Sequence, residues 1–134
     1  MKSKISIMLA VVVLLASMLA CGSSAPAGVS NIYMANDAEG NNKTNTFSPT
    51  DTIYVYFDVN QVEAGASFEI KWYALNVEGQ DPGEPFTVSD YTYSDEASLY
   101  AQIESTTGGF PAGDYKVEIY MNGAKVGEQQ FSVQ

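Results

Sequence analysis

The sequence predicts an all-β fold: an antiparallel sandwich of about seven short strands over residues 29–134. Apolar and polar side chains alternate with a period of two in several runs, as in strands that bury one face. Glycine, proline, asparagine and aspartate separate these runs, and no useful length of helical periodicity follows residue 28. One domain of this size can bury a modest core without disulfides. A barrel of similar strand count is the alternative architecture.

The N-terminal residues have the pattern of a secretory signal peptide. Lys2 and Lys4 form a short positive start, and residues 5–20 are an uncharged stretch rich in valine, leucine, isoleucine, methionine and alanine. This stretch is short for a helix that crosses a bilayer, which needs about 20 residues. A charged start followed by a short apolar region is typical of a secretion signal. We therefore assign residues 1–20 to a signal peptide.

The single cysteine, Cys21, directly follows this apolar stretch. Residues 18–21 (MLAC) resemble the lipobox of bacterial lipoproteins, in which the chain is cleaved before a cysteine whose sulfur carries a diacylglycerol. Gly22 fits this pattern, whereas Met18 and Leu19 depart from it. The resemblance implies a lipoprotein anchored through covalent lipid, palmitate included, on Cys21, and two or more acyl chains anchor stably. A plain secretory signal, an uncleaved anchor and an intermolecular disulfide are the alternatives.

Cleavage before Cys21 would leave an acidic chain. Residues 21–134 hold four lysines and 16 acidic residues, a formal side-chain charge of −12, with no arginine or histidine. Such a chain repels nucleic acid, because binding phosphates requires a basic face. Residues 21–28 (CGSSAPAG) are expected to be a flexible tether beside an extracytoplasmic membrane surface. Gly22, in place of the aspartate that retains lipoproteins at the inner membrane, favours an outer-membrane or cell-surface location.

The first half of the domain is expected to contain four strands. The first, residues 29–35, is weak and is followed by a polar loop, residues 36–50. Two clear strands follow at residues 51–59 (DTIYVYFDV) and 67–75 (SFEIKWYAL). Their inward-facing side chains are Ile53, Val55, Phe57, Val59, Phe68, Ile70, Trp72 and Ala74. After the turn-rich segment VEGQDPGEP, a short strand is expected near residues 86–88.

The second half of the domain is expected to contain three more strands. They cover residues 98–105 (SLYAQIES), 114–121 (DYKVEIYM) and 124–133. Their inward-facing side chains are Leu99, Ala101, Ile103, Tyr115, Val117, Ile119, Met121, Phe131 and Val133. Asn122 and Gly123 form a strong hairpin signal, because both central positions of a two-residue turn favour positive φ. Gly127 is a candidate for a β-bulge, and Tyr91 and Tyr93 are expected in a loop.

Two features resemble the immunoglobulin and fibronectin type III sandwiches. The lone Trp72 falls in the third strand, where these folds have their central tryptophan. The segment FPAGDYKVEIY resembles the tyrosine corner that opens the penultimate strand, with Tyr115 as the tyrosine and with Pro111 and Gly113 shaping the turn. The resemblance implies an immunoglobulin-like sandwich over most of residues 29–134. It departs in lacking the cysteine pair that links the sheets, so packing around Trp72 has to stabilise the core alone.

The sequence does not predict an enzyme. It has no histidine and no cysteine other than Cys21, so the common acid–base and thiol–imidazole arrangements are absent. Acidic pairs that could act on a glycoside lie on the expected outer faces of strands. Solvent there gives carboxyl groups their usual acid–base behaviour. We therefore expect a non-catalytic protein.

A calcium site is a minor alternative. Asp37, Glu39 and Asn41 place oxygen-bearing side chains at alternate positions, as the first part of a calcium loop does. The sixth position is Asn42 rather than glycine, and the twelfth is Ser48 rather than glutamate. We therefore favour a solvated acidic turn and expect no resident cofactor.

Tyrosines point most directly to binding. Five of the nine lie in the polar register of their strands: Tyr54, Tyr56, Tyr73, Tyr100 and Tyr120. An immunoglobulin-like strand order would place Tyr54, Tyr56 and Tyr100 together on one sheet, and the other two on the opposite sheet. Tyrosine offers a large contact area at low entropic cost, so these three are the candidate ligand-binding residues. Cross-strand stabilisation is the alternative role.

These observations predict a membrane-anchored, non-catalytic binding or assembly module of the cell envelope. Its partner would be a protein or a polysaccharide, in addition to the membrane that holds the lipid. A carbohydrate-binding module is the alternative among binding proteins. An accessory or inhibitor domain for secreted enzymes is the contrasting class.

Overall fold

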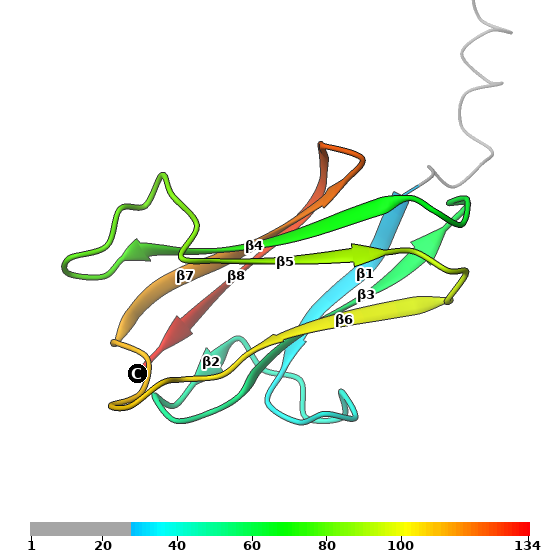
Figure 1. The fold of residues 1–134 in the computed structure, drawn as a ribbon. Coiled ribbons are helices and arrows are strands. Elements are labelled where there is room, and N and C mark those ends of the chain that lie inside the picture. The colour runs from blue at the N-terminus through cyan, green and yellow to red at the C-terminus, as the bar shows by residue number, and fades with distance from the viewer. Residues whose placement is uncertain (1–27) are drawn as a thin grey trace, which may run out of the picture.

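The computed structural model describes residues 28–134, so the predicted signal peptide, Cys21 and the tether before Gly28 lie outside the described residues. Its strands are β1 (Gly28–Ala35), β2 (Thr46–Phe47), β3 (Ile53–Asn60), β4 (Ser67–Asn76), β5 (Thr87–Thr92), β6 (Ser98–Ile103), β7 (Gly113–Met121) and β8 (Ala124–Val133) (Figure 1). The predicted all-β fold is confirmed. From Gly28 onward, no helix is long and apolar enough to cross a bilayer.

The strands form two sheets that pack face to face (Figure 1). One sheet has three strands in the order β1-β3-β6, and the other has five in the order β2-β8-β7-β4-β5. All neighbouring pairs are antiparallel except β2 and β8, which run parallel. Each sheet keeps its own edge strands, so the molecule is a sandwich and not the alternative closed barrel.

Trp72 lies at the centre of the core, as predicted. Its side chain is 0 % exposed, and its ring packs edge-to-face against Phe131 with centroids 5.9 Å apart. Phe131 in turn stacks on Tyr115 at 5.3 Å. Of all the side chains predicted to face inward, Leu99 and Met121 alone are only partly buried. The two-residue alternation therefore assigned the core face of the long strands correctly.

The turn before β7 forms the predicted tyrosine corner. The Tyr115 hydroxyl donates a hydrogen bond to the carbonyl oxygen of Pro111 at 2.6 Å. Burial raises the pKa of Tyr115, so the hydroxyl stays protonated and remains a donor. The bond ties the loop that precedes β7 to a buried ring of the core.

The hairpin between β7 and β8 has the predicted turn and bulge. Asn122 and Gly123 have φ values of 50° and 85°, the positive values that a two-residue turn requires. The pairing of β7 with β8 shifts register between Ile119 and Tyr120, which places a bulge in β8 beside Gly127.

Gly127 also closes one side of the sandwich. A Cβ atom at this position would lie 2.3 Å from Cδ1 of Ile32 in β1. The Ile32 side chain of β1 therefore packs directly over Gly127, where a larger residue would make it move.

The strand expected at residues 86–88 is longer than predicted, and it begins later. β5 covers Thr87–Thr92, so Tyr91 belongs to a strand and not to a loop. Thr87 pairs with Trp72 of β4 and Ser89 pairs with Ile70, so both small polar residues face the inside of the sandwich. Because polar residues occupy the inward positions, β5 lacks the alternation of apolar and polar side chains by which a strand is recognised.

Two further findings concern loops. Tyr93 lies in the loop after β5, as predicted, but it is only 5 % exposed: its ring packs edge-to-face on Phe68, and its hydroxyl donates to the carbonyl oxygen of Glu96 at 2.9 Å. The loop predicted at residues 36–50 contains β2. Two residues are too few to show an alternation, and β2 is recognised only through its parallel pairing with β8.

Candidate functional site

Four tyrosines gather on the outer face of the three-stranded sheet. Tyr56 of β3 pairs directly with Tyr33 of β1 and with Tyr100 of β6, so these three form a row across all three strands. Tyr54 lies two residues along β3, with its ring centroid 6.2 Å from those of Tyr56 and Tyr100. We call these four residues the tyrosine cluster. The predicted grouping of Tyr54, Tyr56 and Tyr100 is thus present, and Tyr33 extends it.

The rings of the tyrosine cluster pack against one another. Tyr33 and Tyr56 stack at 5.3 Å with an interplanar angle of 11°, and Tyr56 and Tyr100 are 5.5 Å apart at 31°. Lys43 places its Nζ 4.1 Å from the centroid of the Tyr33 ring. The faces of the Tyr33 and Tyr56 rings are therefore partly covered by neighbouring side chains.

The loop between β1 and β3 covers one end of the tyrosine cluster. The Tyr56 hydroxyl donates to the carbonyl oxygens of Ala38 and, at 3.4 Å, of Asp37. A Cβ on Gly40 would lie 2.9 Å from the Tyr33 hydroxyl, so a glycine is required for this close approach. Burial and the nearby Asp37 raise the pKa of Tyr56. Tyr56 therefore anchors a loop.

The opposite end of the tyrosine cluster is open. Tyr100 is 59 % exposed, and Tyr54 beside it is half-buried. Neither hydroxyl has a protein hydrogen-bond partner in the part of the chain from residue 28 on. Tyr54 and Tyr100 are therefore the members of the cluster that a partner molecule can reach.

The residues of the calcium alternative lie in the same loop. The carboxylate of Asp37 accepts hydrogen bonds from the backbone N–H groups of Asn41 at 3.0 Å and Asn42 at 2.8 Å. Glu39 and Asn41 are exposed. Residues 28–134 contain no group of three or more acidic, cysteine or histidine side chains placed to hold a metal ion. Asp37 thus shapes the loop that covers Tyr56.

Tyr73 and Tyr120 lie apart from the tyrosine cluster, on the outer face of the five-stranded sheet, as predicted. Lys116 places its Nζ 4.9 Å from the centroid of the Tyr73 ring, and Lys71 lies 4.3 Å from that of Tyr120. Tyr73 is buried although it faces outward. Burial and the carboxylate of Glu118 raise the pKa of Tyr73 to about 12. The side chains on this face thus contact one another, and we call Tyr73, Tyr120, Lys71, Lys116 and Glu118 the polar layer.

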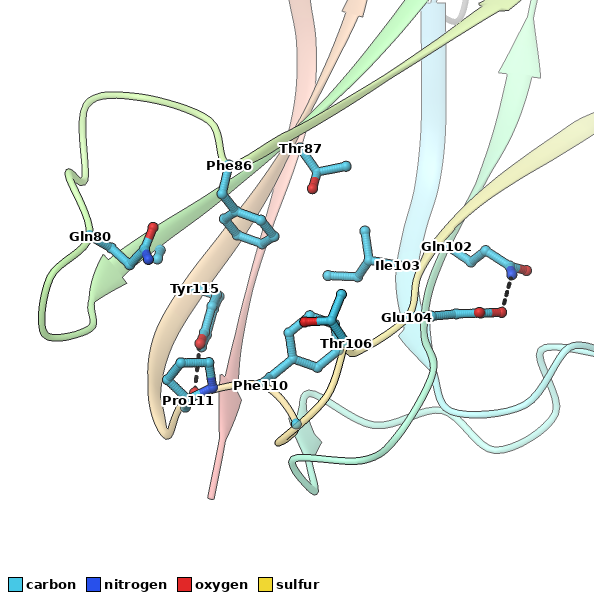
Figure 2. A pocket seen from close by; sticks show the side chains of 12 residues that line it. Gln80, Phe86, Thr87, Gln102, Ile103, Glu104, Thr106, Phe110, Pro111 and Tyr115 are labelled. Carbon is cyan, nitrogen blue, oxygen red and sulfur yellow. Dashed lines mark hydrogen bonds between the residues drawn. The ribbon is translucent and has the colours of Figure 1, made fainter.

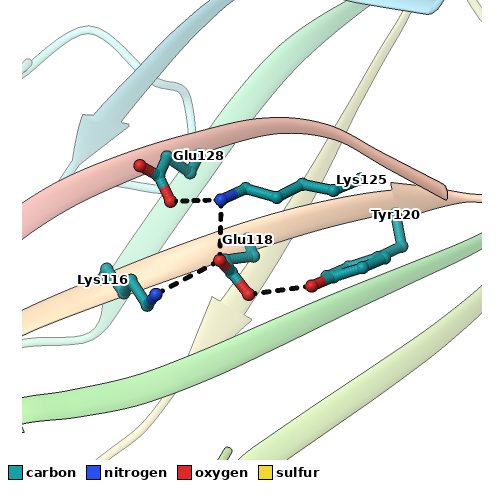
Figure 3. A network of polar contacts seen from close by, with 5 residues as sticks. All are labelled: Lys116, Glu118, Tyr120, Lys125 and Glu128. Atoms are coloured by element: carbon teal, nitrogen blue, oxygen red, sulfur yellow. Dashed lines mark hydrogen bonds and ion pairs between the residues drawn. The ribbon is translucent and has the colours of Figure 1, made fainter. Parts of the chain in front are cut away.

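Glu118 lies at the centre of this polar layer (Figure 3). It is only 5 % exposed, and its carboxylate accepts hydrogen bonds from Lys116 at 3.2 Å and Tyr120 at 3.0 Å and pairs with Lys125 at 2.9 Å. Burial alone would raise the pKa of Glu118, but the three donors outweigh it and lower the pKa to about 2. Lys125 also pairs with Glu128 at 2.7 Å.

Replacing Glu118 by glutamine should remove a pH-dependent part of the stability. A carboxyl with a lowered folded-state pKa stabilises fully above its unfolded pKa and loses that contribution as the pH falls toward about 2. The shift corresponds to on the order of 3 kcal/mol. In urea titrations, the wild type should therefore lose most of its advantage over Glu118→Gln between about pH 5 and about pH 2.

Glu69→Gln is the matched control for this measurement. Glu69 lies on the same outer face, 3.9 Å from Lys71, but its side chain is 37 % exposed. Its contribution should be small at every pH. An unfolding free-energy difference for Glu118→Gln that stays constant with pH would contradict the role assigned to the buried carboxylate.

A second surface feature, which the sequence did not predict, lies between β5 and β6. Two adjoining pockets with volumes of about 390 and 590 Å³ are lined by residues of both strands and meet at Gln102. We call them together the β5–β6 groove. Figure 2 shows the rings of Phe86, Phe110 and Tyr115 around the first pocket, with Glu104 on its far side. Polar inward residues of β5 are the sequence signal that indicates such an opening.

Two packed sheets in this strand order, with a central tryptophan and a tyrosine corner, define an immunoglobulin-like β-sandwich. Solved structures agree. An immunoglobulin-like protein from Pseudomonas aeruginosa matches with a TM-score of 0.59 over 84% of this chain and 100% of that protein, at 10% identity. The soluble domain of PmoD from Methylocystis sp. matches with a TM-score of 0.54 over 83% of this chain and 94% of that domain, at 11% identity.

A third match is to part of a larger protein. The alkylpurine DNA glycosylase AlkC from Pseudomonas fluorescens, bound to DNA containing an abasic site analog, matches with a TM-score of 0.55 at 13% identity. The match covers 83% of this chain but 31% of the glycosylase. No model of a known protein family and no curated protein sequence matches the chain. At these identities the likenesses establish the fold alone.

Proposed function

We propose that the protein is a lipid-anchored, extracytoplasmic binding module of the cell envelope, which engages a partner protein through Tyr54 and Tyr100. The single observation that carries the proposal is the open end of the tyrosine cluster, where Tyr100 is 59 % exposed beside Tyr54. The lipobox-like sequence that ends at Cys21 supports the anchor. A short tether would hold the tyrosine-bearing domain close to the membrane.

A protein partner suits this surface better than a polysaccharide does. Sugar rings stack on flat, open aromatic faces, whereas the rings of Tyr54 and Tyr100 are tilted by 51° to each other and form no flat platform. Tyrosine edges and hydroxyl groups suit a protein surface, where they combine apolar contact with hydrogen bonding at low entropic cost. Carbohydrate binding is the second candidate, because the Tyr100 ring is largely open.

We further propose that the module is not catalytic. The chain has no histidine, and its single cysteine is the proposed lipid attachment site. Glu118 is the buried carboxylate of the described residues, and its oxygens are held by Lys116, Lys125 and Tyr120. Its low pKa keeps it ionised, which does not suit a general acid near neutral pH.

The double variant Tyr54→Ser, Tyr100→Ser should lose its envelope partner while the fold survives. Exposed tyrosines at the centre of an interface commonly contribute most of its binding energy, so we expect affinity to fall at least about 30-fold. The test is a quantitative pull-down from the native envelope with the lipidated protein as bait, scored on proteins that the wild type captures and the double variant does not. Tryptophan emission reports whether Trp72 stays buried.

The double variant Tyr54→Phe, Tyr100→Phe is the matched control. It keeps the ring area and removes the hydroxyl groups, so it should retain most of the captured partner. Equal capture by the wild type and the serine variant would contradict the proposed interface. Saturable binding of a polysaccharide from a glycan panel, lost in the serine variant, would support the carbohydrate alternative in its place.

A further inference from the structure

Exposed apolar side chains are concentrated along one side of the sandwich. The large exposed apolar residues between Gly28 and Gln134 are Phe86, Val88, Tyr91 and Tyr100. Val88 and Tyr91 belong to β5, Phe86 directly precedes it, and Tyr100 belongs to β6. Scattered exposed apolar residues need no explanation, but a contiguous group that borders a groove marks an interaction site. Phe86, Tyr91 and Tyr100 line the β5–β6 groove, whereas Val88 pairs with Lys71 and faces the outer side of the five-stranded sheet.

The same side of the sandwich has two free strand edges. β5 and β6 each stand at the end of their sheet, so each has one neighbouring strand among the described residues. The backbone N–H and C=O groups along the other edge can therefore pair with an added strand. Thr87 and Ser89 face inward from β5 and are too small to fill the space between the sheets. Phe57 and Ile70 supply apolar walls to the groove.

The β5–β6 groove is acidic. Asp90 and Glu96 line one of its pockets and Glu104 lines the other, and no lysine lines either. The lysines of residues 28–134 are Lys43, Lys71, Lys116 and Lys125, and each of them contacts a tyrosine ring or a carboxylate elsewhere. A bound chain would therefore be recognised by positive charge as well as by apolar contact.

We propose that the β5–β6 groove binds an extended cationic peptide segment of a partner protein, added as a strand to the free edge of β5. Alternate side chains of an added strand point to opposite faces. Apolar side chains of the segment enter the groove beside Phe86 and Tyr91. Lysine or arginine side chains face outward beside Asp90, where opposite charges on adjacent strands attract. This site is separate from the open end of the tyrosine cluster apart from Tyr100, which borders both.

The test uses the full-length protein in the neutral detergent dodecyl maltoside and a ten-residue synthetic peptide that alternates lysine with valine and threonine. Nuclear magnetic resonance of the isotopically labelled protein should show saturable shifts confined to residues 86–92 and 98–104. A peptide with glutamate in place of lysine, and one N-methylated at every second residue, should each bind at least about tenfold more weakly. The N-methyl groups leave the side chains in place and block strand pairing.

Two double variants of the protein test whether the acidic residues of the groove contribute to peptide binding. The double variant Asp90→Asn, Glu104→Gln should weaken binding of the lysine peptide by about tenfold. The double variant Glu39→Gln, Glu128→Gln changes the net charge equally, on the loop over Tyr56 and on β8, and should leave binding unchanged.

Three outcomes would overturn the proposal. They are equal binding of the N-methylated peptide, equal weakening by both double variants, and shifts spread over both sheet faces. The Tyr54 and Tyr100 proposal is tested with a different partner, so either proposal can fail without the other.

Discussion

Replacing Trp72 by alanine should unfold the domain or bring it close to unfolding. The indole is 0 % exposed between the two sheets and packs on Phe131, so its removal leaves a cavity that costs about 3–5 kcal/mol. A domain of this kind is commonly stable by about 5–15 kcal/mol, and this one has no disulfide to limit the loss. Urea denaturation followed by far-ultraviolet circular dichroism measures the change without relying on the chain's only tryptophan.

The variant Trp72→Phe distinguishes the contribution of the indole's volume to stability from that of its N–H group. Nε1 of Trp72 is buried and has no hydrogen-bond partner from Gly28 onward, so removing the N–H group should not lower the free energy of unfolding. Only the lost side-chain volume should lower it. We expect Trp72→Phe to cost less than half of what Trp72→Ala costs. Equal, small effects of the two substitutions would contradict the central role of the indole in the core.

The long strands were predictable from the sequence because one period-two pattern determines which face every side chain occupies. Shifting a strand by one residue would exchange its two faces, so the buried Ile53, Val55 and Phe57 leave Tyr54 and Tyr56 no alternative to the outer face. The same logic joined Tyr100 to them once the strand order was known. This part of the candidate site therefore follows from local alternation combined with an immunoglobulin-like topology.

Three features depend on information that alternation does not carry. Glu118 lies in the polar register of β7, but its burial depends on Lys116, Lys125 and Tyr120 closing over it. The loop over Tyr56 depends on hydrogen bonds that Asp37 accepts within that loop. β5 could not be recognised because its inward residues are polar, and the same polarity leaves the β5–β6 groove open.

The two outer faces of the sandwich differ: the five-stranded sheet has the polar layer, and the three-stranded sheet has the tyrosine cluster. Around Glu118, each carboxylate oxygen already has a donor, so a partner would have to break existing bonds to use them. Tyr100, by contrast, is 59 % exposed beside Tyr54. The outer face of the five-stranded sheet is therefore occupied by internal contacts, which leaves the outer face of the three-stranded sheet for the recognition role proposed above.

Replacing Cys21 by alanine should abolish both acylation and cleavage of the signal peptide. If the lipobox-like segment acts as proposed, the alanine variant has no thiol to accept a diacylglycerol and stays an uncleaved precursor of larger mass. Cells fed an alkyne analogue of palmitate should label the wild type and leave Cys21→Ala unlabelled, and fractionation should show the wild type alone with the mature size in membranes. The double variant Cys21→Ala, Ser24→Cys is the matched control. It restores a thiol three residues out of register and should also stay unlabelled, because the signal is read by position. Label on this control would indicate acylation without a lipobox, and an unlabelled wild type would refute the lipoprotein assignment.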